Sequence, residues 1–253
     1  ITDNDSTDKT YEILNDYKNK YSNLFASINI YAEQNLGFGH GHNNNFKNSN
    51  SDFILVTNID LEFESNSILD LVNFAVSDEK DVASWEMRQK PFEHPKYYNP
   101  ITLETNWSSS ACVLFRKSAI NEINGYEKRI FMYGEDVELS YRLRDYGYKL
   151  KYYPKATCWH YTYEEENEVK PLQFLGSTLA NMYIKLRYGT LKDILFGYIY
   201  FIGLFLLPKQ FKSQRKDLLR YTVKLIKNSF YFYTFRKKSE IKFNFYGFDY
   251  ELT

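Results

Sequence analysis

The segment from Phe131 to Arg144 carries two adjacent carboxylates, Glu135 and Asp136, which follow a glycine and open a helical pattern. A helix N-terminus favours the ionised form of a carboxylate. An ionised carboxylate within hydrogen-bond reach of a hydroxyl can remove its proton as a general base. Asp136 is therefore a candidate base, and Glu135 a candidate for holding an acceptor or a basic partner. An acidic pair at a helix start is also a common structural feature, and that alternative stays open here.

Another acidic group, Asp60, ends the tripeptide Asn58-Ile59-Asp60, which follows the apolar run Phe53–Thr57. Such a run is typical of a parallel strand buried on both faces. A carboxylate at its end suits a divalent cation that neutralises a diphosphate. One imidazole, His160, could complete the metal shell, and a histidine ligand favours Mn²⁺ over Mg²⁺. The alternatives are an aspartate that caps the next turn and a structural histidine.

Two polar segments near the start are candidates for ligand binding. Asp3 lies just past a strand end, where its carboxylate can accept a hydrogen bond from a nucleobase, although a plain strand–turn–helix junction has the same pattern. In the segment 34–43, three glycines at alternate positions allow a ligand to approach the backbone closely. The spacing matches neither a P-loop nor a dinucleotide fingerprint. His40 and His42 could bind a metal, but a flexible polar loop is the favoured interpretation.

An aromatic residue and three small residues stand before another strand, as Trp107-Ser108-Ser109-Ser110. The serines leave room for a ligand, and the indole offers a face on which a sugar can stack. A core tryptophan beside a turn is the competing interpretation. Trp107 is therefore a candidate acceptor or substrate residue.

The order of patterns predicts an α/β fold with a mostly parallel sheet flanked by helices. In such sheets ligands bind at the carboxyl ends of the strands, where the acidic residues fall. The strands are expected at 27–31, 53–57, 82–87, 111–115, 150–153 (ending at Pro154) and 157–159, and the helices at 11–21, 68–76, 116–123 and 135–146, with a loop at 35–45. The start at Ile1-Thr2 has the character of a strand end, so an earlier strand is expected to be missing.

The composition changes after about Leu172. Residues 194–207 are uncharged and apolar but shorter than the roughly 20 residues that span a bilayer, so we expect an interfacial helix, with a buried packing helix or a true span as the alternatives. The net charge is zero, yet residues 209–242 hold eleven basic against two acidic side chains. This basic segment predicts an anionic membrane surface as a partner. Cys112 and Cys158 lie in apolar contexts, which favours a reducing compartment.

Taken together, the segments resemble the family 2 inverting glycosyltransferases with the GT-A fold, in particular their bacterial rhamnosyltransferase-like branch. The resemblance covers about residues 1–165, and its motifs keep the family's order. They are Asp3 to Thr10, Asn35 to Gly39, Asn58 to Asp60, Gly125-Tyr126 with Phe131 to Leu139, and Tyr153-Pro154 leading to His160. The family's first strand is absent, Lys9 stands where glycine is common, and Ser108 to Ser110 replace small, glycine-rich residues.

The resemblance implies a role for several positions. Asp3 corresponds to the acid that contacts the base, with Asn35 and Gly37 lining the nucleotide pocket. Asp60 corresponds to the metal-binding acid of a DxD-type motif, Asp136 to the catalytic base, and His160 to a late histidine near the metal.

We therefore expect a metal-dependent inverting glycosyltransferase with a divalent cation, Mn²⁺ or Mg²⁺. The donor would be a UDP- or dTDP-sugar, and the acceptor a glycan or glycolipid in cell-surface polysaccharide or glycolipid synthesis. Residues 1–170 would form the GT-A domain and residues 171–253 a helical, apolar and basic extension at the inner face of the cell membrane. No nucleic-acid partner is expected. The rivals are a non-catalytic nucleotide-sugar-binding module, a nucleotidyltransferase, which would need a basic phosphate loop that is not seen, and a membrane scaffold.

Overall fold

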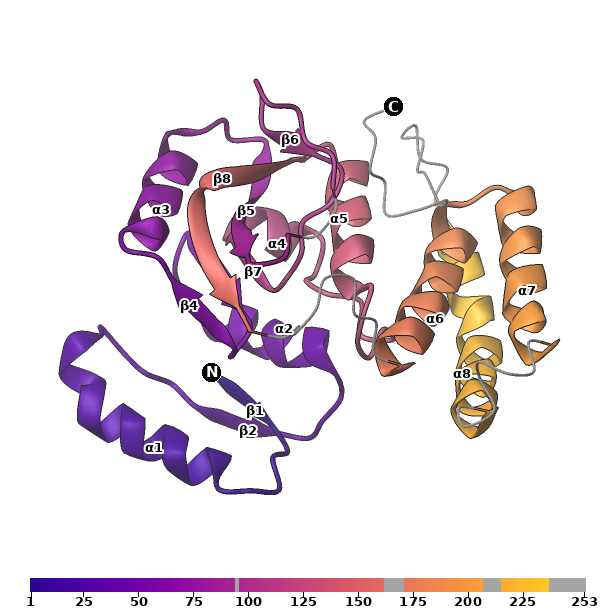
Figure 1. The fold of residues 1–253 in the computed structure, drawn as a ribbon, viewed down its shortest axis with the longest axis horizontal. Coiled ribbons are helices and arrows are strands. Elements are labelled where there is room, and N and C mark those ends of the chain that lie inside the picture. Colours follow the sequence, from indigo (N-terminus) through magenta and orange to yellow (C-terminus); the bar gives the residue numbers. More distant parts are fainter. Residues whose placement is uncertain (94–95, 162–170, 207–214, 237–253) are drawn as a thin grey trace.

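The computed structural model describes residues 1–93, 96–161, 171–206 and 215–236, which form a sheet domain and a group of three helices beside it (Figure 1). The strands are β1 (Thr2–Asn4), β2 (Tyr31–Glu33), β3 (Phe53–Thr57), β4 (Leu61–Phe63), β5 (Val82–Lys90), β6 (Glu104–Thr105), β7 (Cys112–Arg116) and β8 (Lys149–His160). The helices are α1 (Thr10–Tyr21), α2 (Phe38–Asn48), α3 (Ser67–Ser77), α4 (Lys117–Glu122), α5 (Glu135–Asp145), α6 (Pro171–Tyr188), α7 (Leu191–Leu206) and α8 (Arg215–Thr234), with a 3₁₀ turn at Ser22–Leu24.

The central sheet has the order β3-β7-β5-β8-β4, and β6 pairs with β8. Helices cover both of its faces, as the side chains of β5 show on either side of a register shift between Val82 and Ser84. Trp85 and Met87 pack with Leu71 and Ala75 of α3, whereas Ala83 packs with residues of α4 and α5 on the other face. The predicted α/β architecture with flanking helices is confirmed.

The expectation of a mostly parallel sheet is wrong. Within the six-stranded sheet β5 and β8 are the only neighbouring strands that pair in parallel, since β7 pairs antiparallel with both β3 and β5, and β8 pairs antiparallel with β4 and β6. A second parallel pair, β1 with β2, forms a separate two-stranded sheet. Continuous apolar runs report burial on both faces, and an antiparallel strand covered by helices meets that condition equally well.

Three local predictions also differ from the structure. The expected strand at 27–31 is found at Tyr31–Glu33, and the expected loop at 35–45 is largely helix α2. Glycine disfavours a helix, but a Cβ at Gly39 would lie 2.6 Å from Tyr126, so its absence lets α2 pack closely. Strand β8 continues past Pro154, because Tyr153 pairs with Met87 and Thr157 with Arg88, which leaves the proline in a bulge.

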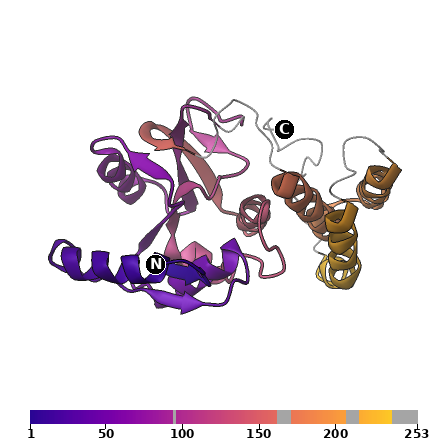
Figure 2. The same ribbon diagram turned by 60° about the horizontal axis from the view of Figure 1, so that its bottom comes forward.

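The helix α5 lies between the sheet and the three C-terminal helices (Figures 1 and 2). Glycines bound it as predicted: Gly134 has φ +85° before the first turn and Gly147 has φ +88° after the last. Helices α6, α7 and α8 share one apolar core of their own. Phe201 and Leu204 of α7 face that core, while Phe196 and Ile199 are exposed. Helix α7 therefore has both a packing face and an uncovered apolar face. Over the described ranges, none of the helices is long and apolar enough to cross a membrane.

Candidate active site

Asp60 and His160, a hundred residues apart in sequence, lie side by side in the structure. Antiparallel pairing of β4 with β8 sets Leu61 opposite His160, and the Tyr161 N–H donates to Asp60 O at 3.1 Å. The Asp60 Oδ1 atom is 3.4 Å from His160 Nε2. The sequence prediction that these two side chains meet is thus matched by the geometry.

The orientation of the His160 ring is set by Gln89 of β5. Its Nδ1 atom lies 2.8 Å from the carbonyl oxygen Oε1 of Gln89. Since that oxygen only accepts, Nδ1 carries the proton and Nε2 presents a lone pair toward Asp60 and Asn58, whose Nδ2 is 3.4 Å away. Burial lowers the pKa of His160, although Asp60 opposes this shift, and the lowered pKa favours the neutral ring.

A carboxylate and a neutral imidazole fit a divalent cation, and an outer partner such as Gln89 is the usual way to orient a histidine ligand. Within the described ranges, no group of three or more His, Cys, Asp or Glu side chains gathers at one point. A cation held by Asp60 and His160 would therefore draw its other ligands from water and from the oxygens of a bound diphosphate.

Asp136 stands in the first turn of α5 and is partly buried. Its Oδ1 atom accepts from the Val137 N–H at 2.9 Å and its Oδ2 atom from the Ser110 N–H at 3.4 Å. Burial raises the pKa of Asp136, while these N–H groups and the ammonium of Lys96 counter the rise. A carboxylate with a raised pKa that is still stabilised in its ionised form suits proton abstraction near neutral pH.

Glu135 has a different environment from its neighbour. Its side chain is buried, and among the described residues its Oε2 atom has no hydrogen-bond partner. Burial, together with the charge of Asp136, raises the pKa of Glu135 to about 8. At neutral pH this carboxyl group is therefore largely protonated, which separates its chemistry from that of Asp136.

The two halves of the site are joined by one short segment. Ser110 donates to Asp136, and the next carbonyl, Ala111 O, accepts from the Asn58 N–H at 2.9 Å. Asn58 in turn contacts His160, which faces Asp60. A continuous polar path thus runs from the candidate base to the candidate metal ligands.

The predicted nucleotide residues lie on β1 and on the approach to α2. Asp3 is buried and its Oδ2 accepts from the Ser6 N–H at 3.2 Å, so it shapes its own turn. Asn35 is exposed, and its Oδ1 accepts from the Gly37 N–H at 3.3 Å. Gly37 has φ +106°, and a Cβ there would lie 2.2 Å from Phe131 O. The structure therefore ties this loop to the segment that leads into α5.

Two further candidates are buried among aromatic and apolar groups. Trp107 is 5% exposed, and the Lys96 ammonium lies 4.0 Å from its ring centroid. A sugar could stack on that face only if Lys96 moved, so the stacking role stays a prediction that this geometry does not favour. His42 packs 4.4 Å from the Phe38 ring, and burial lowers its pKa to about 4.

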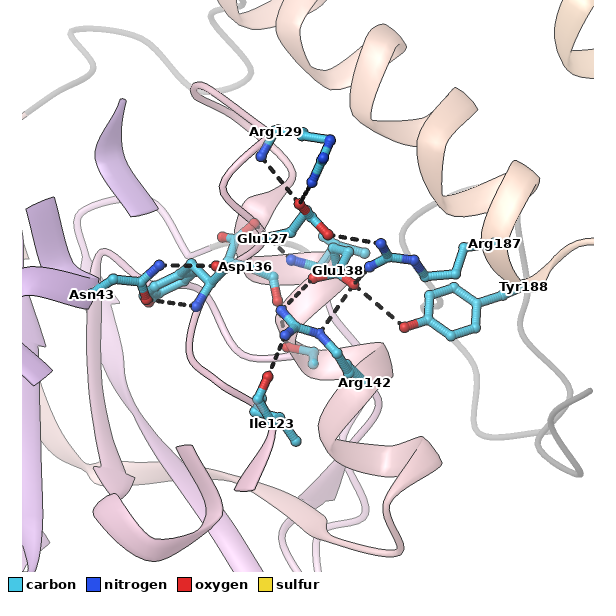
Figure 3. A network of polar contacts seen from close by, with 12 residues as sticks. Asn43, Ile123, Glu127, Arg129, Asp136, Glu138, Arg142, Arg187 and Tyr188 are labelled. Carbon is cyan, nitrogen blue, oxygen red and sulfur yellow. Dashed lines mark hydrogen bonds and ion pairs between the residues drawn. The ribbon is translucent and has the colours of Figure 1, made fainter. Parts of the chain in front are cut away.

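A buried ionic network behind the site was not predicted from the sequence (Figure 3). Arg187 of α6 donates to Glu138 of α5 at 2.6 Å and to Glu127 at 2.7 Å. Arg142 also donates to Glu138, at 2.7 Å. Burial opposes ionisation of Glu138, but the two arginines hold its pKa below the usual range. In the sequence, Glu138 and Arg142 have the i,i+4 spacing of an exposed ion pair on a helix. Nothing in the sequence near Arg187 indicates that it contacts Glu138.

Similarity to known proteins agrees with this geometry. Residues 1–136 match the model of glycosyl transferase family 2. The N-acetylglucosaminyl-diphospho-decaprenol L-rhamnosyltransferases of two strains of Mycobacterium tuberculosis are 36% identical to the chain over 74 residues, which cover 29% of this chain and 21% of the relative. The match thus spans about a fifth of the length of those curated relatives.

Two solved structures share the architecture at 12% sequence identity. One is the mannosyltransferase PcManGT from Pyrobaculum calidifontis in complex with GDP-Man and Mn²⁺, with a TM-score of 0.50 over 91% of this chain and 76% of that chain. The other is GalNAc-T7 with UDP, GalNAc and Mn²⁺, with a TM-score of 0.59 over 87% of this chain and 47% of that chain. The fold is thus GT-A, and because the family match covers more than half of the sequence and reaches Asp136, the chain belongs to glycosyl transferase family 2.

Proposed function

We propose that the chain carries out metal-dependent, inverting transfer of a sugar from a nucleoside diphosphate-sugar to a hydroxyl group of a glycan or glycolipid acceptor. The observation that carries this proposal is the polar path from Asp136 through Ser110 and Asn58 to the Asp60–His160 pair. It sets a candidate base and a candidate metal pair on either side of one backbone segment. Membership of a glycosyltransferase family supports the reaction class.

In the proposed step, Asp136 accepts the proton of the acceptor hydroxyl, and the acceptor oxygen forms a bond to the anomeric carbon of the donor. The bond between that carbon and the diphosphate oxygen breaks, and the diphosphate leaves with the electron pair. Attack from the face opposite the leaving group inverts the anomeric configuration. A cation bound by Asp60 and His160 would offset the negative charge on the diphosphate.

The donor is proposed to lie along Asp3, Asn35 and Gly37, with UDP or dTDP as its nucleotide. The lack of a Cβ at Gly37, which brings this loop against Phe131, supports a nucleotide pocket that borders the entrance to α5. The relatives are named for a lipid-diphosphate acceptor, which supports an acceptor in glycolipid or cell-surface polysaccharide synthesis.

Asp136→Asn is the most direct test. The amide keeps the size of the side chain but cannot take the proton. We expect the rate of transfer to fall by about 10²–10⁴-fold, the usual contribution of a general base. Thermal shifts with UDP or dTDP and Mn²⁺ should match those of the wild type. Transfer at the wild-type rate would rule out the mechanism, and nucleotide-induced shifts without turnover by the wild type would favour a binding module.

An anionic membrane surface is the proposed location, at the inner face of the cell membrane. Helix α8 exposes apolar side chains, among them Ile226 and Phe230, beside the basic residues Arg220 and Lys227, and α7 adds its uncovered apolar face. Apolar area combined with positive charge is the pattern of interfacial helices. Five of the eleven basic residues of the expected segment, at 209, 212, 237, 238 and 242, lie outside the described residues.

Vesicle flotation would test this location. We expect the protein to float with vesicles that contain phosphatidylglycerol and not with pure phosphatidylcholine vesicles, and the binding to weaken as salt rises. Exchange of Arg220 and Lys227 for glutamate should reduce it. Equal flotation with both vesicle types would remove the electrostatic part of the proposal.

A further inference from the structure

A lysine and a glutamate are buried together next to residues Ser108 to Ser110, which we call the serine segment. The side chains of Lys96 and Glu86 are 3% and 1% exposed, and Lys96 Nζ contacts Glu86 Oε2. The same ammonium donates to Trp107 O at 3.2 Å and covers the Trp107 ring. Burying two charges costs more free energy than one ion pair commonly returns, so such a pair is weak evidence of a stabilising role.

The glutamate of this pair belongs to a row of backbone hydrogen bonds. Ser108 N–H donates to Ser140 Oγ at 3.0 Å, Ser109 N–H to Glu86 Oε2 at 2.7 Å, and Ser110 N–H to Asp136 Oδ2 at 3.4 Å. Three successive N–H groups are thus bound by three different side chains.

Both ends of this row of hydrogen bonds lead to helix α5, which carries the candidate base Asp136. Ser140 Oγ, which accepts the first N–H, itself donates to Asp136 O at 2.7 Å. The third N–H ends on the Asp136 carboxylate. Since Ser109 and Ser110 are adjacent, loss of the Ser109–Glu86 hydrogen bond would free the backbone that carries the Ser110 N–H to Asp136.

We propose that the buried Lys96–Glu86 pair is a positioning device for Asp136, which holds the Ser109–Ser110 backbone in place and sets a positive charge beside the base. The inference rests on the proposed function, because it assigns the base role to Asp136. Lys96 and Glu86 act through the segment and need not touch the substrate.

The charges around Asp136 give the inference a measurable signature. The titratable groups that face it are Glu135 on its own helix, Glu86 of β5, Lys96 of the following segment and the Tyr126 phenol. Lys96 lowers the pKa of Asp136 against the effect of burial. Removing its charge should raise that pKa further, so Asp136 should take up its proton at a higher pH.

The first variant is Lys96→Met, which removes the charge and shortens the unbranched side chain by one heavy atom. The titration of Asp136 can be followed by its carboxyl ¹³C resonance, assigned as the signal that Asp136→Asn removes. Exchange of the Ser109 and Ser110 amides reports the position of the segment. We expect the titration midpoint to rise and these amides to exchange at least about tenfold faster, as the loss of a hydrogen bond implies.

Two double variants keep the test informative if an unpaired Glu86 impairs folding. Glu86→Gln with Lys96→Met is neutral and still offers an oxygen to Ser109, so both the midpoint and the amide protection should return toward the wild type. Glu86→Leu with Lys96→Met is also neutral but lacks that acceptor, so the amides should stay unprotected. Protected amides in the leucine variant would overturn the positioning role.

A matched control is Lys151→Met on another side of the sheet domain. Lys151 forms an ion pair with Asp78 at 2.6 Å, with side chains 11% and 8% exposed, whereas the N–H groups of Ser108 to Ser110 are bound by Ser140, Glu86 and Asp136. Lys151→Met should leave the Asp136 midpoint and the amide exchange of Ser109 and Ser110 unchanged. Equal changes in Lys151→Met and Lys96→Met would refute the inference.

The two proposals can also fail separately. Transfer that persists in Asp136→Asn would refute the proposed function together with this inference. Loss of transfer in Asp136→Asn, combined with an unaltered midpoint and unaltered exchange in Lys96→Met, would refute the inference alone.

Discussion

The buried network around Arg187 allows a quantitative prediction for Arg187→Met. The guanidinium donates to Glu138 at 2.6 Å and to Glu127 at 2.7 Å, and all three side chains are at most 8% exposed. Removing one partner of a buried ion pair destabilises a protein by about 3–5 kcal/mol, because the remaining charge has no compensation.

The remaining contacts decide where in this range the variant falls. Glu138 keeps its hydrogen bonds from Arg142, so it stays paired. Glu127 keeps the backbone N–H of Arg129 at 3.2 Å, the Arg129 guanidinium at 3.6 Å, whose side chain is 42% exposed, and the Tyr231 hydroxyl at 3.4 Å. The uncompensated charge is thus mainly that of Glu127, and we expect the free energy of unfolding to fall by about 3 kcal/mol, the lower end of the range.

Urea unfolding followed by circular dichroism measures this change, with an unchanged m-value as evidence that the folded state is retained. The control is Arg220→Met on α8, where the pair with Asp217 is 3.3 Å long and its members are 70% and 38% exposed. That variant should cost about 0–1 kcal/mol. A loss below about 1 kcal/mol in Arg187→Met would refute the reasoning about buried charge.

The dependence on pH gives a second check on the same variant. Arg142 and Arg187 hold the pKa of Glu138 below its usual range, so this pairing stabilises the fold above the unfolded pKa, and the contribution is lost as pH falls through the folded pKa. Once Glu127 and Glu138 are protonated, they carry no charge that Arg187 must compensate. The difference in the free energy of unfolding between the wild type and Arg187→Met should therefore become smaller below about pH 4.

Three further outcomes are expected. Gly37→Ala, with φ +106° and a Cβ 2.2 Å from Phe131 O, should lower the thermal midpoint more than Gly147→Ala, with φ +88° and open space around it; equal losses would show that the contact is not limiting. Glu135→Gln should remove the fall in stability that the wild type shows as pH rises from about 4.5, the ordinary glutamate pKa, to about 8, since burial raises the pKa of Glu135 in the folded state; parallel profiles from denaturant unfolding would contradict this. Gln89→Leu should weaken Mn²⁺ affinity in the presence of UDP by about 10–100-fold, measured by calorimetry, and unchanged affinity would exclude Gln89 as the orienting partner of His160.

Much of the fold was predictable because its elements carry strong periodic signals. The helices at α1, α3 and α5 and the strands at β3, β5 and β7 were expected near their observed bounds. The direction of the strands could not be predicted, since burial on both faces is the same for parallel and antiparallel strands. Helix α2 was missed because its glycines disfavour a helix locally, and only the approach to Tyr126 explains them.

The candidate site was also predictable only in part, where residue type and position along the chain were informative. Asp60 and His160 could be predicted to meet, because each follows a strand and their types suit a metal. Lys96 and Glu86 could not, since their pairing depends on a turn of the chain between β5 and β6 and on burial that no local pattern reports. Trp107 is the reverse case: its type suggested a ligand surface, the fold packs it against Val137 and Tyr141, and its role toward a sugar stays a prediction.

The continuity of α5 and β8 has a consequence for how the chain tolerates changes in length. Asp136 stands at the start of α5, His160 at the end of β8, and only residues 146–148 separate the two elements. One residue inserted into α5 would rotate everything after it by about 100°, and one inserted into β8 would turn the following side chains to the opposite face. We therefore expect related sequences to carry no insertions or deletions between Asp136 and His160, except in the turn at residues 146–148 and in the bulge at Pro154. Differences in length should occur elsewhere in the chain.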